Sequence, residues 1–272
     1  MRYCFLRFPG GKLKAVTLSY DDGVREDYQL IEIMRKHGLC GTFNVNSGLY
    51  GPDDRSGHRL SAEECRELFS GDGVEAAIHG TLHPTWNAQE EITALYDIMN
   101  DRLELEKLFK KPIYGGAYPY GAYNDRVVEQ LRACGIKYCR TTVTTERTYM
   151  PENWLTLHPT CHHNNPRLME LAKAFIDGKY PREPRMFYLW GHSYEFPKDN
   201  NWQVIEEFAE LMGSAEGIWH ATNTEIYDYT EAFKSLRFSA NGDSVYNPTC
   251  TEVWFAAGKE IISVKPGQYL CF

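Results

Sequence analysis

The sequence predicts an α/β protein: a distorted (β/α) barrel of about seven strands with a small β appendage at the C-terminus. Short β-like runs alternate with amphipathic helical segments over most of the 272 residues, and this alternation is typical of parallel strands joined by helices. About seven strand and helix pairs favour a closed or nearly closed barrel. The helical period ends near residue 237, where Asn-Gly, Asn-Pro and Pro-Gly turn signals separate short β-rich runs. We therefore expect a barrel over 1–236 and a β-rich appendage packed on it over 237–272.

The first half of the chain contains the clearest elements. Gly38 is a C-terminal signal for the first helix, and Pro112 stops the third. Ser61 and Glu64 have the spacing of a capping box at the start of the second helix. These signals predict strands at 14–20, 41–46 and 74–79, and helices at 24–38, 61–69 and 88–110.

The second half continues the alternation up to the appendage. Asn124 is the expected N-cap of a helix that follows the strand "PIYGGAY". The remaining periodic segments predict strands at 112–118, 136–142, 185–193 and 217–223, and helices at 124–135, 165–178, 201–213 and 227–236.

Composition and charge exclude several classes of function. The formal net charge is −8 and no cluster of Lys and Arg is present, which argues against a nucleic-acid-binding surface. No apolar run approaches the length of a membrane span. The eight cysteines lack CxxC spacing and the N-terminus lacks the features of a signal peptide, so we expect reduced thiols and a cytoplasmic location. A leader trimmed from the chain would instead indicate secretion.

Polar side chains gather at the ends of the predicted strands, where a parallel barrel carries its functional groups. The first strand ends in Asp21 and Asp22, and the third ends in His79, with His83 four residues later. The acidic pair either divides metal binding and proton transfer between its members or lies in a solvated turn without function. Two imidazoles and one carboxylate form a set that leaves coordination positions open. We expect a divalent ion there, Zn²⁺ first, with Co²⁺, Ni²⁺ or Mn²⁺ as alternatives.

Four motifs in this order resemble a known family. "SYDDG", "HGTLHP", "YPYG" and "LWGH" are similar to the successive motifs of the polysaccharide deacetylase family, the NodB-type fold of carbohydrate esterase family four, over roughly residues 14–222. The resemblance implies a distorted (β/α) barrel with a bound metal. By role, it implies Asp21 as general base, His192 as general acid, and the metal ligands Asp22, His79 and His83.

The activity that the resemblance implies is removal of N-acetyl groups from an acetylated amino-sugar oligo- or polysaccharide, with release of acetate. The stretch Tyr118, Pro119 and Tyr120 would then lie beside the substrate, and the backbone near Tyr120 would stabilise the oxyanion. Two alternatives stay open at this point: a hydrolase of a non-sugar amide on the same fold, and a catalytically silent carbohydrate-binding barrel.

The sequence also departs from the family pattern. The family usually has an Arg two residues before the Pro of its third motif, where Ala117 stands here. Arg140 is our candidate for the missing partner of Asp21, with a structural ion pair as the alternative.

A family Asp-Trp pair that supports the general acid has no clear counterpart. His162 and His163 either line the cleft or cap the helix expected from Asn165. Glu195 is the candidate for raising the pKa of His192, and Trp190 either stacks on a sugar ring or packs in the core.

Overall fold

The centre of the protein is an eight-stranded parallel sheet curved into a half-barrel. The computed structural model describes residues 3–51, 58–180 and 182–272, so the first residues of the predicted 1–236 range lie outside it. Seven strands follow the order β6-β5-β4-β3-β2-β8-β7, and β9 pairs with the start of β2. The strands are β2 (Lys14–Asp21), β3 (Gly41–Val45), β4 (Val74–Ile78), β5 (Gly115–Ala117), β6 (Tyr138–Arg140), β7 (Cys161–His162), β8 (Arg185–Gly191) and β9 (Ile218–His220). The predicted distorted barrel is confirmed.

The chain segment 141–160, which contains a short 3-10 helix at Trp154–Thr156, joins β6 and β7, the two edge strands of the half-barrel. Near the end of this segment, Leu157 forms an isolated parallel bridge with Arg140 of β6. Further along, the backbone N–H of Thr160 donates to Tyr188 of β8 at 2.8 Å. The same segment therefore hydrogen-bonds to the edge strand β6 and to β8, the neighbour of the other edge strand β7.

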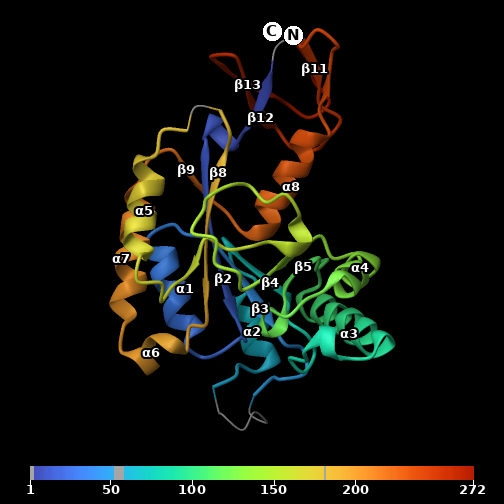
Figure 1. Cartoon of the computed structure of the whole chain (residues 1–272), viewed down its shortest axis with the longest axis vertical. Helices are drawn as coiled ribbons and strands as arrows, with labels where there is room; N and C mark the ends of the chain where they lie inside the picture. The colour runs from blue at the N-terminus through green and yellow to red at the C-terminus, as the bar shows by residue number, and fades with distance from the viewer. Residues whose placement is uncertain (1–2, 52–57, 181) are drawn as a thin grey trace.

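Helices cover the outside of the sheet, with α1, α5 and α7 on one side and α3 and α4 on the other (Figure 1). Two predicted caps are confirmed, since Ser61 and Glu64 form the capping box of α2 and the Asn124 side chain accepts from the N–H of Val127 at the start of α4. The last helix, α8, begins earlier than the predicted residue 227, behind a capping box of Thr222 and Glu225. The helices are α1 (Asp27–Lys36), α2 (Ala62–Leu68), α3 (Glu91–Phe109), α4 (Asp125–Ala133), α5 (Leu168–Asp177), α6 (Glu195–Asp199), α7 (Trp202–Ser214) and α8 (Asn223–Lys234).

Two small antiparallel sheets form the end of the molecule that holds both termini (Figure 1). One has the order β1-β12-β13 and the other β10-β11-β14. Their strands are β1 (Cys4–Arg7), β10 (Arg237–Phe238), β11 (Ser244–Tyr246), β12 (Val253–Ala257), β13 (Glu260–Val264) and β14 (Tyr269–Cys271). The sequence prediction missed β1, which pairs with β12 and so joins the N-terminus to the C-terminal segment. The boundary at 236/237 stays a prediction.

The interior contains two hydrophobic clusters. The larger one fills the space between the barrel and its helices. The second is shared between the barrel and the end sheets, because Tyr188 of β8 and Ile226 of α8 belong to it together with Phe255 of β12. Within the described ranges, no helix has the length and apolar character needed to cross a membrane.

Candidate metal centre and active site

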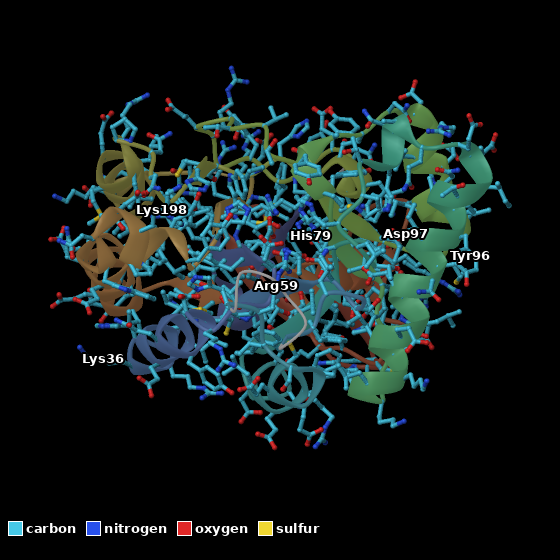
Figure 2. All side chains as sticks on the ribbon, turned by 90° about the horizontal axis from the view of Figure 1, so that it is seen from below. Lys36, Arg59, His79, Tyr96, Asp97 and Lys198 are labelled. Atoms are coloured by element: carbon cyan, nitrogen blue, oxygen red, sulfur yellow. The ribbon has the colours of Figure 1, made fainter. Side chains whose placement is uncertain are left out.

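The predicted site residues meet at the C-terminal edge of the half-barrel. A pocket of about 370 Å³ opens there. Its lining residues come from several strand ends: Asp21, Asp22, His79, His83, Tyr118, Tyr120, Gly121, Thr142, Trp190, His192 and Tyr194. Seen from this end of the molecule, His79 and Arg59 lie centrally, inside the surrounding helices (Figure 2). The sequence prediction that these motifs converge is therefore met by the structure.

Asp22, His79 and His83 form a group that could hold a metal ion, with their ligand atoms within 4.8 Å of one another. The Nε2 atoms of the two histidines lie 3.1 Å apart, and His83 Nε2 lies 4.0 Å from Asp22 Oδ1. His79 Nδ1 is 2.9 Å from the carbonyl oxygen of Ala117, which assigns the ring proton to Nδ1 and leaves the Nε2 lone pair facing the group. Burial lowers the pKa of His79, and burial together with His79 lowers the pKa of His83 to about 4. Both rings are therefore neutral, as metal ligands are, and the residues fit a divalent cation.

The backbone around the ligands is unusual. Asp22 has φ 86° and His83 has φ 52°, conformations that cost side-chain-bearing residues energy and are common at functional sites. Asp101 of α3 accepts from the N–H groups of Ser47 and His79, both at 2.9 Å. The helix thereby fixes the strand end from which His79 projects.

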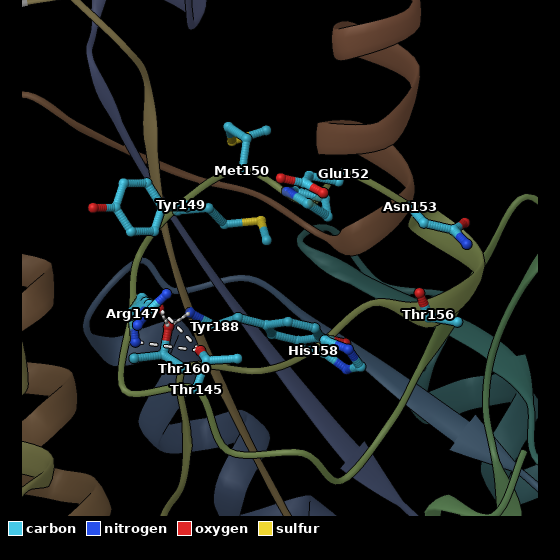
Figure 3. A pocket seen from close by; sticks show the side chains of 12 residues that line it. Thr145, Arg147, Tyr149, Met150, Glu152, Asn153, Thr156, His158, Thr160 and Tyr188 are labelled. Carbon is cyan, nitrogen blue, oxygen red and sulfur yellow. Dashed lines mark hydrogen bonds between the residues drawn. The ribbon is translucent and has the colours of Figure 1, made fainter.

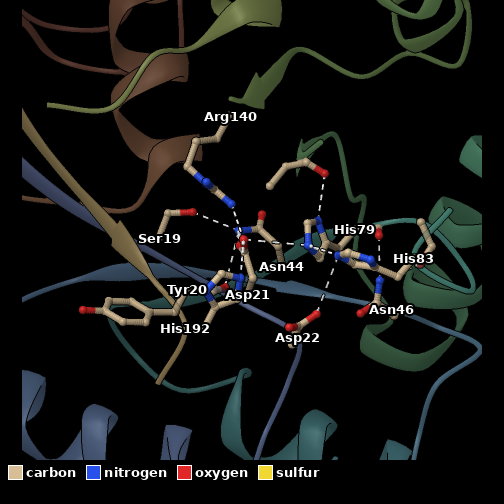
Figure 4. A network of polar contacts seen from close by, with 12 residues as sticks. Ser19, Tyr20, Asp21, Asp22, Asn44, Asn46, His79, His83, Arg140 and His192 are labelled. Atoms are coloured by element: carbon tan, nitrogen blue, oxygen red, sulfur yellow. Dashed lines mark hydrogen bonds and ion pairs between the residues drawn. The ribbon is translucent and has the colours of Figure 1, made fainter. Parts of the chain in front are cut away.

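Asp21 is buried at the centre of a polar network (Figure 4). Its Oδ1 accepts from Asn44 Nδ2 at 2.8 Å, and its Oδ2 contacts a guanidinium nitrogen of Arg140. Burial alone would raise the pKa of Asp21, but the charges of Arg140 and His192 and the Arg140 hydrogen bond outweigh it and lower the pKa to about 2. Asp21 is therefore ionised at neutral pH. The predicted contact between Asp21 and Arg140 is present.

His192 lies between Asp21 and Glu195. Its Nε2 is 3.8 Å from Asp21 Oδ2, and its Nδ1 is 3.5 Å from Glu195 Oε2. Burial lowers the pKa of His192, whereas the hydrogen bond to Glu195 and the charges of Asp21, Asp22 and Glu195 raise it and prevail. The expectation that Glu195 supports the charged imidazole therefore agrees with the geometry.

His162, His163 and Glu195 form a second group that has the composition of a metal site. The Nε2 atoms of His162 and His163 lie 3.1 and 3.3 Å from Glu195 Oε2. However, the backbone N–H of Asn164 donates to His162 Nδ1 at 3.1 Å. The ring proton of His162 is therefore on Nε2, which donates a hydrogen bond to Glu195. In His79 the proton is on Nδ1 and the Nε2 lone pair faces the metal group, whereas in His162 the proton is on Nε2 and faces Glu195. This arrangement favours Glu195 as a hydrogen-bond acceptor over metal binding by this second group.

The helix-cap interpretation of His162 and His163 is wrong, because α5 begins at Leu168 and both imidazoles face Glu195 instead. Trp190 is buried, with the Arg140 guanidinium 4.3 Å above its ring, so it packs against the ion pair and reaches the pocket with only a small part of its surface.

The "YPYG" motif forms a tight turn at the end of β5. Tyr118 is buried and donates its hydroxyl to Leu155 O at 2.6 Å. Pro119 is buried beside it, and Tyr120 is exposed with φ 58° and its ring edge-on to His83 at 4.4 Å. Tyr120 is therefore the aromatic side chain of this motif that a ligand can reach.

A larger cavity of about 580 Å³ lies under the loop that precedes β7 (Figure 3). It is lined by residues such as Arg147, Glu152 and His158. It contains neither the acidic pair nor the histidines of the metal group, so its size alone does not make it the reaction site.

Sequence reasoning missed three polar residues of the site. Asn44 lies near the end of β3 and Asn46 directly follows it, and Arg59 contacts Asp22 from a separate segment. Two asparagines in the otherwise apolar run "TFNVN" were a usable signal, because buried amides need partners. Nothing in the sequence around Arg59 indicates its contact with Asp22.

An α/β half-barrel with a two-histidine, one-carboxylate group at its strand ends defines the class, and comparison with known proteins identifies the family. Residues 9–139 match the family described as polysaccharide deacetylase, and the chain carries a domain of this family. No curated protein matches the chain.

The similarity to solved structures of the same fold covers more of the chain than residues 9–139. A provisionally assigned polysaccharide deacetylase from Mycobacterium smegmatis has a TM-score of 0.60 at 16% identity, over 86% of this chain and 96% of that one. The chitin deacetylase of Colletotrichum lindemuthianum has a TM-score of 0.52 at 16% identity, over 79% and 87%. The family 4 carbohydrate esterase of Streptomyces lividans, in complex with acetate, has 0.51 at 15% identity, over 75% and 90%. At these identities the likeness is one of fold.

Proposed function

We propose that this protein is a metal-dependent hydrolase that removes N-acetyl groups from an acetylated amino-sugar oligo- or polysaccharide and releases acetate. The observation that carries the proposal is the position of ionised Asp21 and raised-pKa His192, 3.8 Å apart, beside the Asp22, His79 and His83 group. Amide hydrolysis needs a proton acceptor and a proton donor in opposite charge states. Membership in the polysaccharide deacetylase family supports the acetylated carbohydrate as substrate.

Each residue has a distinct task in the proposed reaction. A divalent cation held by Asp22, His79 and His83 would polarise the amide carbonyl and lower the pKa of a water molecule. Zn²⁺ is the ion we propose, with Co²⁺, Ni²⁺ or Mn²⁺ as alternatives. Asp21 accepts the proton of the attacking water, and Arg140 and Asn44 hold its carboxylate in place.

The leaving group requires a proton when the amide C–N bond breaks. Protonated His192 donates it to the amine nitrogen, so the products are acetate and a free amino sugar. Glu195 keeps the ring oriented, because its carboxylate faces Nδ1 and leaves Nε2 toward the pocket. The backbone N–H of Tyr120 is our candidate for stabilising the oxyanion.

The alternative of a silent carbohydrate-binding barrel loses its main support. It rested on the absence of the family Arg, at Ala117, and of the Asp-Trp pair. Arg140 contacts Asp21 and Glu195 contacts His192, so both reacting groups have charged partners from other positions. We therefore propose a catalytically competent site.

Acetate release from N-acetylglucosamine oligomers tests the assignment of roles. We expect Asp21→Asn and His192→Ala each to lower kcat by at least about 100-fold, since general acid–base groups contribute factors of this size. Glu216→Gln removes an exposed charge from the turn before β9, serves as the control and should leave kcat unchanged. If either site variant hydrolyses the oligomers at the wild-type rate, the roles assigned to Asp21 and His192 are wrong.

A further inference from the structure

Arg59 reaches the candidate metal centre from outside the motifs that define it. Its guanidinium contacts the backbone carbonyl oxygen of Asp22 and lies 3.1 Å from the Oδ1 of the same residue. The same nitrogen that contacts the carbonyl also donates to Asn46 Oδ1 at 2.6 Å. Only 14% of the Arg59 side chain and 12% of the Asp22 side chain are exposed, so these contacts are largely shielded from water.

The backbone fixes Arg59 in this position. Arg59 forms an isolated antiparallel bridge with Val24. On either side of it, the N–H of Arg25 donates to His58 O at 2.8 Å and the N–H of Leu60 donates to Gly23 O at 3.0 Å. These backbone hydrogen bonds hold residues 58–60 beside residues 23–25, which directly follow Asp22.

Asp22 needs such support because of its backbone conformation. At φ 86° a residue with a side chain is strained by about 1–3 kcal/mol, and such strain persists only where surrounding contacts impose it. Arg59 holds both the carbonyl oxygen and the carboxylate of this residue. A planar guanidinium with several donors can bind two acceptors at once, which an ammonium group cannot do with the same geometry.

Arg59 also connects the two halves of the ligand set. Asn46 is buried, accepts from Arg59, and donates through Nδ2 to His79 O at 2.6 Å and Gly80 O at 2.8 Å. One network therefore runs from the Asp22 carboxylate through Arg59 and Asn46 to the backbone of His79. Arg140 holds Asp21 in a similar way, so each carboxylate of the adjacent pair has its own guanidinium.

We infer that Arg59 is a positioning residue that holds Asp22 in its ligating conformation and thereby sets the affinity of the site for a divalent cation. The inference rests on the proposed metal site, but it concerns a residue outside the family motifs. Two effects of Arg59 oppose each other: its positive charge disfavours a nearby cation, and its hydrogen bonds orient the ligand. Arg59 makes hydrogen bonds to the carbonyl oxygen and the carboxylate of Asp22 and to the side chain of Asn46. We therefore expect the orientation of Asp22 to be the larger effect.

The test is the Zn²⁺ dissociation constant of the metal-free full chain, measured by titration calorimetry. We expect Arg59→Gln to weaken Zn²⁺ binding by about ten-fold or more, the usual cost of losing an outer partner of a ligand. Arg59→Lys keeps the positive charge but loses the planar guanidinium with its several donors. Its Zn²⁺ dissociation constant should fall between those of Arg59→Gln and the wild type. Arg25→Gln is the matched control, because Arg25 is a neighbouring guanidinium that is 55% exposed and pairs with Glu64, and it should bind Zn²⁺ as the wild type does.

The outcomes separate this inference from the proposed function. Zn²⁺ binding by Arg59→Gln that equals or exceeds wild-type affinity overturns the positioning role and indicates that charge repulsion prevails. If circular dichroism shows that Arg59→Gln is unfolded, Arg59→Lys decides, and wild-type affinity in that variant also overturns the role. Failure of the wild-type chain to bind Zn²⁺, or binding that survives His79→Asn, contradicts the proposed metal site itself.

Discussion

At the scale of single residues, adjacent carboxylates coexist because each has its own cationic partner. Asp21 contacts Arg140, and Asp22 contacts Arg59. Arg140 is fully buried and stacked on Trp190, so removing it would leave Asp21 as an uncompensated charge in the interior. The positions of the two guanidiniums explain how "SYDDG" is accommodated before any cation binds.

Arg140→Gln should therefore destabilise the fold strongly. We expect the free energy of unfolding, measured by urea denaturation, to fall by about 3–5 kcal/mol, which is typical when one member of a buried ion pair is removed. Arg132→Gln removes the same group from an exposed i,i+3 pair with Glu129 and should cost at most about 1 kcal/mol. Equal, small losses in both variants would show that Arg140 does not stabilise Asp21.

At the scale of elements, the ends of the neighbouring strands β7 and β8 pack closely, because Gly191 at the end of β8 lies against His163, which follows β7. A side chain at Gly191 would place its Cβ 1.9 Å from His163 Nδ1, so the glycine of "LWGH" makes room for the His163 ring. Burial and the neighbouring His162 lower the pKa of His163 to about 3, and a neutral ring packs there, stacked on Phe196 at 4.2 Å. The glycine at position 191 is thus explained by its close packing against His163, which directly follows the neighbouring strand β7.

Gly191→Ala should consequently cost more stability when His163 is present than when it is absent. We expect a loss of about 1–3 kcal/mol in the free energy of unfolding, the usual cost of overpacking. In a His163→Ala background the same substitution should cost at least about 1 kcal/mol less, since residues in contact are not additive. An identical cost in both backgrounds would contradict the explanation of the glycine.

The elements also show what the sequence can and cannot predict. The hydrophobic periods predicted the main strands and helices, and Ser61, Glu64 and Asn124 marked helix starts that the structure confirms. The strands β1 and β7 were missed because β7 has only two residues and β1 is defined by pairing with β12, which is distant in sequence. Contacts such as Arg59 with Asp22 depend on that kind of long-range placement, so local patterns do not indicate them.

At the scale of the whole molecule, the half-barrel brings strand ends from all along the chain to one pocket, while the end sheets occupy the opposite end (Figure 1). The second hydrophobic cluster joins those sheets to the barrel through residues such as Tyr188 and Phe255. This arrangement leaves the C-terminal edge of the barrel accessible, which suits a substrate as large as an oligosaccharide.

The proposed metal-dependent deacetylation at this edge is tested most directly by acetate release as Zn²⁺ is returned to metal-free protein. We predict no acetate from N-acetylglucosamine oligomers without metal, and a rise to a plateau at about one ion per chain. His83→Asn should shift this titration to much higher Zn²⁺ concentrations, because it removes one of three ligands. Acetate release that persists in chelator, or that is identical in His83→Asn, would contradict the account.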